Sequence, residues 1–297
     1  MKNTPISKFM LGTVQLGVNY GMANKIGKPS EEAAFELLDT AKAHGVTALD
    51  TASHYGDSER VVGAWLQSRK AECFTVSKFK LFSEDPLSEL EEQIVESKAR
   101  LGKIDGYMYH DADQMRRWHG TVKERLERMK EEEDMRFYGA SVYTAEDVED
   151  FLKLDGLGAI QMPMSLLDTR IIERGLLKEL HDRGVLVFIR SVFLQGMLCM
   201  DTPPEKFDFM KPSIDLLREV AKAEGISLMQ MAVSFIRDLP EVDALVLGCE
   251  KPEQVIANAE LVNSPKLSDS ATREILEIGK KVPIELCMDI ITGKVKR

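Results

Sequence analysis

Four residues in the first half of the chain carry side chains that can hold, tune or move a proton: Asp50, Tyr55, Lys78 and His110. Three of them end short, largely apolar segments, and Tyr55 follows Asp50 by five residues. A tyrosine hydroxyl has an ordinary pKa of about 10, so it is a poor proton donor near neutrality. An adjacent ammonium would lower that pKa, and a carboxylate would fix the ammonium in place.

A neutral imidazole at His110 could hydrogen-bond a carbonyl oxygen and orient it. The set therefore suits general acid–base chemistry in which an oxygen is protonated while a hydride reaches the adjacent carbon. The hydride must come from a cofactor because no side chain supplies one. The chain contains neither G-x-S-x-G nor H-E-x-x-H, so no nucleophile or zinc signature competes, and we expect no metal site.

Short β-rich runs alternate with segments of helical period, a pattern that favours a parallel sheet. The expected strands are Phe9–Thr13, Thr47–Thr51, Phe74–Lys78, Gly106–His110, Phe137–Ser141, Ala159–Met162, Val185–Arg190 and Ala244–Gly248. Eight such units favour closure into a (β/α)8 TIM barrel, whose strands all end at one rim. We therefore expect a single domain over residues 1–297, with the proton-handling residues gathered at that rim.

The expected helices carry recognisable start signals. They include Glu31–His44, Leu87–Leu101, Thr121–Glu132, Ile214–Glu224 and Leu228–Arg237. Ser30 suits an N-cap, Thr144 and Ser227 begin capping-box patterns, and Pro252 suits a first helical turn. The Pro-rich stretch 200–209 is interpreted as a long loop over the rim after the seventh strand. An extra C-terminal helix is expected over Ser268–Val282, followed by a tail that could cross the rim.

Composition excludes several classes of protein. The formal net charge of −10 argues against nucleic-acid binding, which needs clustered Lys and Arg. No stretch approaches the roughly 18 apolar residues of a membrane span, and the N-terminus opens no secretory signal. The cysteines form no C-x-x-C pair and are expected to be buried thiols: Cys73, Cys199, Cys249 and Cys287. We expect a cytoplasmic protein that acts on a small molecule.

The segment Leu49–Glu59 matches the pattern D-T-A-x-x-Y-G-x-S-E, and here the chain resembles the aldo-keto reductase family. Lys78 and His110 follow at the separations typical of that family, and the resemblance runs from Leu11 to Asn258. It implies an NAD(P)H-dependent oxidoreductase that reduces an aldehyde or ketone, or oxidises the matching alcohol. Asp50, Tyr55, Lys78 and His110 would be the catalytic tetrad, with Tyr55 as the acid or base.

The resemblance also implies that NAD(P)H lies extended across the rim. Ser141 and Gln161 would hold the nicotinamide carboxamide, the segment Val187–Leu198 would line the ring and pyrophosphate, and Gly248–Asn258 would hold the adenosine end. The full set of expected cofactor contacts is Gly12, Thr13, Ser141, Gln161, Arg190, Ser191, Phe193, Gln195, Gly196, Gly248, Lys251, Gln254 and Asn258.

Two departures from the family pattern concern the nicotinamide end. Val142 follows Ser141 where the family usually has asparagine, and Arg190 replaces an aromatic residue that usually stacks on the nicotinamide. A guanidinium can also stack flat on a ring. Arg190 could instead bind an anionic substrate or pair with a cofactor phosphate.

Further departures concern the adenosine end. Gly248 and Gln254 stand where strict NADPH users carry basic residues, and Glu250 adds negative charge. Lys251 could still meet a 2′-phosphate. NADP(H) is the usual cofactor of the family, and NAD(H) stays open as an alternative.

Two other functions stay open beside a net reductase. One is a redox-neutral isomerase or epimerase that keeps NAD(P) bound, and the other is a non-catalytic NADPH-binding regulatory subunit. The substrate would be a small carbonyl compound, and Arg190 and His54 suggest a polar, sugar-like one. The aromatic residues expected to line its pocket are Tyr20, Trp118, Phe193 and Phe207.

Overall fold

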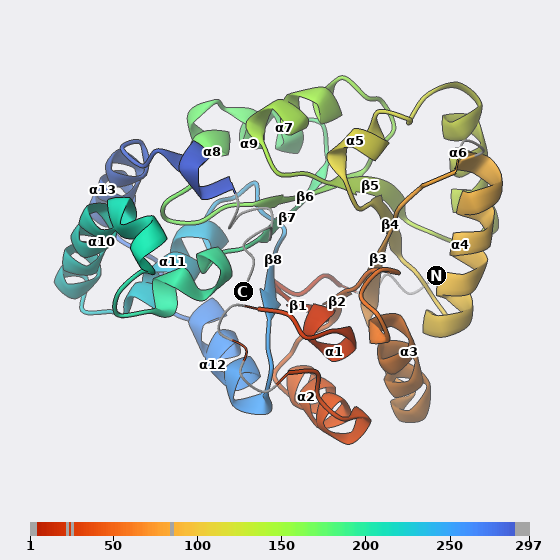
Figure 1. The fold of residues 1–297 in the computed structure, drawn as a ribbon, viewed down its shortest axis with the longest axis horizontal. Helices are drawn as coiled ribbons and strands as arrows, with labels where there is room; N and C mark the ends of the chain where they lie inside the picture. The colour runs from red at the N-terminus through yellow and green to blue at the C-terminus, as the bar shows by residue number, and fades with distance from the viewer. Residues whose placement is uncertain (1–4, 22–23, 25–26, 84–85, 289–297) are drawn as a thin grey trace.

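The computed structural model describes residues 5–21, 24, 27–83 and 86–288. Its strands form a closed barrel in the order β1 to β8, and each neighbouring pair, including β1 with β8, is parallel. Helices surround the strands, as Figure 1 shows. The predicted (β/α)8 barrel is confirmed.

The strands begin and end within two residues of their predicted positions. They are β1 Phe9–Gly12, β2 Ala48–Asp50, β3 Phe74–Phe79, β4 Gly106–Tyr109, β5 Phe137–Ser141, β6 Ala159–Pro163, β7 Leu186–Arg190 and β8 Ala244–Gly248. The α-helices are α1 Val14–Gly17, α2 Glu31–Ala43, α3 Ser58–Arg69, α4 Pro86–Leu101, α5 Ala112–Met115, α6 Gly120–Glu132, α7 Ala145–Leu152, α8 Arg170–Glu173, α9 Leu176–Asp182, α10 Lys211–Ala223, α11 Leu228–Arg237, α12 Pro252–Val262 and α13 Asp269–Gly279. Three 3₁₀ helices complete the set: η1 Leu194–Cys199, η2 Glu205–Met210 and η3 Ile284–Cys287.

The predicted helix starts are confirmed by their hydrogen bonds. Ser30 and Ser227 accept from backbone amides in the first turns of α2 and α11, and Thr144 forms a reciprocal capping box with Asp147 at α7. Pro252 is the first residue of α12. The extra C-terminal helix is α13, capped by Ser268.

Residues 200–209, after β7, were predicted to form one irregular loop, but the structure differs. Residues 205–210 form η2, which runs directly into α10. The two prolines at 203 and 204 precede this turn, where a missing backbone donor costs little, so they do not prevent it. The predicted tail across the rim follows Val282: its first part contains η3, and residues 289–297 lie outside the described residues.

The interior of the barrel is a compact apolar layer made of Met10, Ala48, Phe74, Val76, Met108, Phe137, Ala159, Phe188 and Ala244. Successive strand residues face opposite sides of a sheet, so a residue two positions after an interior residue faces inward as well. Six inward positions at or just beyond the strand ends are polar and two are glycine: Gly12, Asp50, Lys78, His110, Ser141, Gln161, Arg190 and Gly248. This alternation places a polar ring at the C-terminal rim of the barrel, above the apolar layer.

Outside the barrel, a larger apolar cluster joins the outer faces of the strands to the helices. All four cysteines are free thiols. Cys73, Cys249 and Cys287 are buried as predicted, but Cys199 is exposed, because it ends η1 at the surface instead of lying inside a packed element. No helix in the described ranges is long and apolar enough to cross a membrane.

Candidate active site

Lys78, a member of the polar ring, is held by three hydrogen bonds from its ammonium group. Its Nζ donates to Oδ1 and Oδ2 of Asp50 at 2.7 and 2.8 Å, and to the carbonyl oxygen of Thr51 at 3.0 Å. The Lys78 side chain is fully buried and that of Asp50 is 4% exposed. All three ammonium protons therefore have acceptors on the adjacent strand end, which fixes the position of this charge.

The pair is held from a third strand. Gln161 on β6 donates its Nε2 to Asp50 Oδ1 at 2.7 Å. Burial lowers the pKa of the Lys78 ammonium, and the Asp50 carboxylate opposes that shift. A buried charge of this kind is tolerated only with such partners, because breaking a buried pair costs about 3–5 kcal/mol.

Tyr55 lies in a tight turn between β2 and α3 that is packed against α1. A Cβ added to Gly17 would lie 1.6 Å from the carbonyl oxygen of Tyr55, so only glycine allows this approach. Ser58, the first residue of α3, donates to the Thr13 carbonyl oxygen at 2.8 Å, and its hydroxyl contacts those of Thr13 and Thr51 at 2.7 and 2.9 Å. These buried contacts tie the turn to the ends of β1 and β2.

The Tyr55 ring faces two other members of the predicted tetrad. The Lys78 Nζ lies 5.2 Å from the centroid of the Tyr55 ring, and the rings of Tyr55 and His110 meet edge to face at 5.4 Å. Asp50, Tyr55, Lys78 and His110 thus lie together at one rim. Their assembly follows from the inward alternation of β2, β3 and β4 and from the Gly17 contact.

The pKa of Tyr55 differs from the sequence expectation. Burial raises the pKa of Tyr55 well above its ordinary value, and the charge of Asp50 raises it further. The predicted lowering of this pKa is wrong, because the burial of the phenol outweighs the effect of nearby positive charge. Tyr55 therefore carries its proton at neutral pH.

His110 follows β4, and its backbone amide continues the ladder to the Phe79 carbonyl oxygen at 2.9 Å. Burial, reinforced by the charges of Lys78 and Lys80, lowers the pKa of His110 to about 2. The imidazole is therefore neutral. Its Nδ1 is buried without a hydrogen-bond partner among the described residues, and such a group needs a partner from a ligand or water.

The rim from β5 to β7 contains the residues predicted to meet the nicotinamide. Ser141 and Gln161 are both buried and pair across β5 and β6. Because Gln161 commits its Nε2 to Asp50, its amide oxygen is the atom left to accept from a carboxamide. The guanidinium of Arg190 lies 4.3 Å from the centroid of the Tyr143 ring and donates to the Val142 carbonyl oxygen at 3.0 Å.

The segment after β7 has an unusual backbone. Ser191, Leu194 and Gln195 have φ of 61°, 47° and 53°, and Gly196 has φ of 92°. Left-handed conformations at non-glycine residues cost energy and cluster at ligand-binding segments. Phe193 packs partly buried against the outer core. Of the predicted contacts in this segment, Ser191, Gln195 and Gly196 thus lie on a turn with left-handed backbone conformations that follows β7.

The turn between β8 and α12 is held by two predicted contacts. Gln254 accepts from the backbone amide of Glu250 at 2.6 Å, and Asn258 donates to the Cys249 sulfur at 3.3 Å. Lys251 is the exposed N-cap residue of α12. Burial raises the pKa of Glu250. Gln254 and Asn258 therefore shape this turn themselves, which limits their freedom to bind a ligand directly.

These features fit a nicotinamide dinucleotide along the rim. Gln15 lies over Gly248, where an added Cβ would be 2.4 Å from its Nε2, and its Oε1 is buried without a described partner. Gly12 pairs with Gly248 between β1 and β8, and Thr13 donates to the Asp50 carbonyl oxygen. Two unsatisfied polar atoms, at Gln15 beside the end of β8 and at His110 beyond the end of β4, thus lie at the rim.

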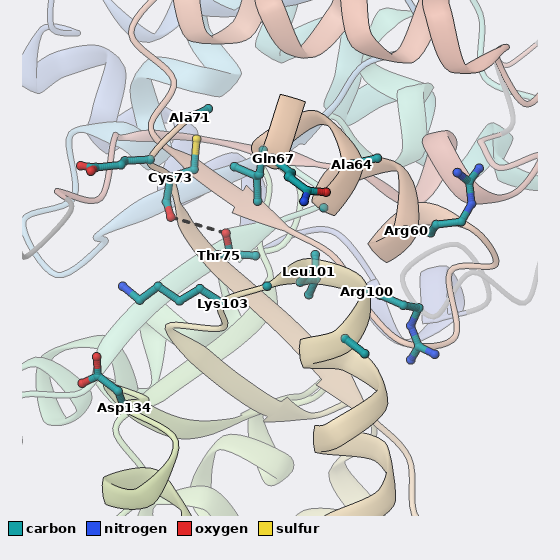
Figure 2. A pocket seen from close by; sticks show the side chains of 15 residues that line it. Arg60, Ala64, Gln67, Ala71, Cys73, Thr75, Arg100, Leu101, Lys103 and Asp134 are labelled. Carbon is teal, nitrogen blue, oxygen red and sulfur yellow. Dashed lines mark hydrogen bonds between the residues drawn. The ribbon is translucent and has the colours of Figure 1, made fainter. Parts of the chain in front are cut away.

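A separate pocket of about 980 Å³ lies away from the tetrad (Figure 2). It is lined by α3, the end of α4 and the start of β3, including Arg60, Gln67, Cys73, Arg100 and Lys103. Two of the cations that line it are already paired, Arg100 with Glu59 and Lys103 with Asp105. The pocket contains no member of the polar ring, so it is not part of this site.

The aromatic residues predicted to line the substrate pocket are only partly suitable. Tyr20 is 41% exposed, but Trp118 and Phe207 are buried among the outer elements, and Trp118 donates to the Asp155 carbonyl oxygen. That part of the prediction is wrong because neither side chain reaches the rim surface. The sequence analysis did not predict a role for Phe82, which follows β3 and is 70% exposed. The sign of it in the sequence is an aromatic residue in the loop that follows Lys78 by a few positions.

Comparison with known proteins gives a consistent picture. The family model described as "Aldo/keto reductase family" matches residues 8–280. An aldo-keto reductase of Bacillus subtilis is 26% identical over 290 residues, covering 86% of this chain and 85% of the relative. An NADH-specific methylglyoxal reductase of Escherichia coli is 26% identical over 312 residues, covering 89% and 92%.

Two solved structures share the fold. The holo form of an aldo-keto reductase from Bacillus halodurans superposes with a TM-score of 0.74 at 24% identity, covering 92% of each chain. A glycerol dehydrogenase from Gluconobacter oxydans superposes with a TM-score of 0.75 at 22% identity, covering 95% of this chain and 94% of the other. At these identities the likeness is one of fold.

Proposed function

The chain belongs to the aldo/keto reductase family, and we propose that Tyr55 is the general acid and base with which this enzyme interconverts a carbonyl compound and its alcohol. Membership makes the protein an oxidoreductase that acts on small carbonyl substrates with a nicotinamide cofactor. Bound NAD(P)H would supply the hydride, since no side chain can.

The observation that carries the proposal is the fixed ammonium of Lys78. Its protons all point to Asp50 and Thr51, while its charge lies 5.2 Å from the Tyr55 ring centroid. In the reduction direction the Tyr55 hydroxyl gives its proton to the carbonyl oxygen, and the nearby ammonium stabilises the phenolate left behind. In the oxidation direction the phenolate takes the proton back.

The raised pKa of Tyr55 suits the reduction direction. The hydroxyl keeps its proton until an acceptor of comparable or greater basicity forms beside it, and the alkoxide created by hydride addition is a stronger base than a phenolate. Neutral His110 would bind the carbonyl oxygen and orient it toward Tyr55. Its unpartnered Nδ1 is available for such a contact.

We propose that the dinucleotide lies across the ends of β5 to β8 and β1. Ser141 and the Gln161 amide oxygen would hold the carboxamide, and Arg190 with the segment from Ser191 to Gly196 would line the ring and pyrophosphate. Gly12 and Thr13 would border the opposite side. The N-terminus of α12, with Lys251, would receive the adenosine end, since helix N-termini favour anions.

Cofactor preference depends on Glu250 and Lys251, which carry opposite charges at the predicted adenosine end. NADP(H) is the usual cofactor of the family. A carboxylate beside the ribose favours a free 2′-hydroxyl over a 2′-phosphate, and one E. coli relative is described as NADH-specific. NAD(H) therefore stays a serious alternative for this chain.

The substrate proposed from the sequence is a polar, sugar-like carbonyl compound. Arg190 supports it, because its guanidinium lies at the rim and contributes to the electrostatics of Tyr55, Lys78 and His110. Two relatives act on small oxygenated compounds by their descriptions, methylglyoxal for one and glycerol for the other.

One experiment tests the proposal. The purified protein is titrated with NADPH and NADH by fluorescence, and the tighter binder is then used to screen carbonyl compounds for reduction. We expect saturable binding of at least one cofactor and its oxidation by one or more aldehydes or ketones. Nucleotide retained through purification, with no exchange and no net oxidation, would instead favour the redox-neutral isomerase. Absence of binding of either cofactor would contradict the proposal.

A further inference from the structure

The loop after β3 presents an apolar ring to solvent beside the tetrad. Phe82 is 70% exposed, the highest value among the exposed large hydrophobic side chains of the described residues. Its ring lies 5.6 Å from the ring of His54, the residue before Tyr55. Single exposed apolar side chains are common on protein surfaces, so the position of this ring beside the tetrad, and not its exposure alone, is the informative feature.

The backbone that carries Phe82 is fixed by side chains from two helices. Gln114 of α5 donates to the Leu81 carbonyl oxygen and accepts from the Leu81 amide, both at 2.9 Å. Glu89 of α4 accepts from the amides of Phe82 and Ser83 at 2.7 and 2.8 Å. A loop bonded in this way keeps its apolar side chain in one place before any ligand arrives, so binding does not have to order it.

Four rings form a continuous row from the tetrad outward. Tyr55 meets His110 at 5.4 Å, His110 meets His54 at 6.3 Å, and His54 meets Phe82 at 5.6 Å between centroids. Exposure increases along the row, from the partly buried Tyr55 and His110 to the exposed His54 and Phe82. The row is therefore a wall of rings that runs from the solvent-exposed loop after β3 to the Tyr55 ring.

His54 contributes a flat neutral surface to this wall. Its Nδ1 is hydrogen-bonded to the Ser53 hydroxyl at 2.9 Å, and that hydroxyl also donates to the Lys78 carbonyl oxygen at 3.0 Å. Partial burial and the charge of Lys80 lower the pKa of His54. The ring is thus held by the strand that carries Lys78, and it is tilted by 52° against the ring of Phe82.

We propose that Phe82 and His54 form a substrate-selecting wall that packs against an aryl or similarly flat apolar group attached to the reacting carbonyl. This inference rests on the proposed reductase function and names its substrate class. A flat group gains apolar burial and aromatic contact on Phe82, whereas a short alkyl or polyhydroxylated chain leaves the ring exposed. His54, suggested by the sequence as a polar contact, thus adds to an apolar wall on this side of the rim, while Arg190 at the end of β7 stays the proposed polar contact.

The test compares benzaldehyde with propanal, an aryl and an alkyl aldehyde, in the intact protein with the tighter-binding cofactor. Phe82→Ala is expected to lower kcat/KM for benzaldehyde by about tenfold, mainly through KM, and to change that for propanal by less than about twofold. Phe82→Tyr keeps the ring and should stay near the unsubstituted protein. Val95→Ala removes another exposed apolar side chain, 66% exposed on α4, and serves as the matched control with no expected change.

A binding measurement keeps the test independent of turnover. With oxidised cofactor present, saturation-transfer NMR should show transfer to the aromatic protons of benzaldehyde in the unsubstituted protein and a clear loss of transfer in Phe82→Ala. An unchanged ratio of the two aldehydes, or equal transfer in both proteins, would overturn the wall while leaving the reductase function intact. Failure of any carbonyl compound to oxidise either cofactor would count against the reductase function instead, and the NMR comparison would still decide the wall.

Discussion

The two halves of the barrel rim are built differently. In the half that we propose to be catalytic (the catalytic half), formed by the ends of β2, β3 and β4, Lys78 and Asp50 are buried and bonded to each other, and the Tyr55 turn admits only glycine at position 17. In the half that we propose to hold the cofactor (the dinucleotide half), formed by the ends of β5 to β8, Arg190 is partly buried and Gly248 is exposed. That half also carries the departures from the family pattern.

The difference shows which part of the site is constrained by internal packing. Each polar side-chain atom of Lys78 and Asp50 is hydrogen-bonded to another group of the protein. A substitution of either residue therefore affects both folding stability and the proposed chemistry. In the other half Gly248 and Lys251 are exposed, so substitutions at such positions disturb the internal packing less. Gln161 is the link, because it belongs to β6 but donates to Asp50.

Lys78→Met is expected to have the largest effect, because it removes the buried charge on which the catalytic half depends. The variant leaves the Asp50 carboxylate buried without its cation, and we expect a loss of about 3–5 kcal/mol in the free energy of unfolding. Turnover should fall by at least about a hundredfold. Urea denaturation and steady-state kinetics measure the two effects. Adding Asp50→Asn should recover part of the stability but none of the turnover; recovery of turnover would mean that the pair serves folding alone.

Gly17→Ala disturbs the catalytic half without touching a reacting group. The new Cβ would meet the Tyr55 carbonyl oxygen at 1.6 Å, so the turn must shift. We expect an overpacking cost of about 1–3 kcal/mol and a loss of about tenfold to a hundredfold in kcat, because small misplacements of a catalytic group are costly. Gly63→Ala is the matched control, with a Cβ 1.8 Å from the Arg100 carbonyl oxygen between α3 and α4. It should lower stability similarly and leave kcat unchanged, and equal kcat losses would contradict the assignment.

The lowered pKa of His110 predicts that the free energy of unfolding depends on pH. Its pKa is lowered from 6.5 to about 2 by burial, so between these values the unfolded chain binds a proton that the folded protein does not. Stability contributed by the neutral ring is complete above pH 6.5 and falls as the pH decreases, by up to about 1.4 kcal/mol per pH unit. Denaturation of the unsubstituted protein and His110→Gln between pH 4 and 7 checks this. The variant should lose less stability on acidification, and parallel curves would show that His110 titrates normally.

Glu250→Lys probes the dinucleotide half and has the smallest expected effect. We expect affinity for NADPH to rise more than affinity for NADH, by about tenfold or 1.4 kcal/mol, because the new cation meets only a 2′-phosphate. Glu253→Lys, in the first turn of the same helix, controls for a general gain in positive charge. Fluorescence titration with both cofactors is the measurement. Equal gains for the two cofactors would mean that the adenosine end lies elsewhere.

Local patterns made the barrel and the tetrad predictable. The strands are apolar runs that end in one inward polar residue, and Asp50, Lys78 and His110 each follow an interior residue by two positions. That spacing is readable in the sequence because strand side chains alternate. The helix caps at Ser30 and Thr144 are equally local.

The features that were missed depend on contacts between distant segments. The pKa of Tyr55 is set by burial and Asp50, and the sequence gives the neighbours of Tyr55 but not the balance of their charges. Phe82 owes its position to Gln114 and Glu89, which lie on two different helices. Trp118, an aromatic residue in a loop, is instead buried against the outer core, because only the packing of neighbouring helices decides which side such a residue faces.

Tyr55→Phe tests most directly whether the buried phenol beside Lys78 transfers the proton. The variant keeps the ring that packs on His110 and removes only the hydroxyl, so affinity for the cofactor should stay within about twofold while kcat falls by about 10²–10⁴. Cofactor titration and steady-state carbonyl reduction on the same preparation give both numbers. A kcat close to that of the unsubstituted protein would contradict the account, because the proton would then come from another group.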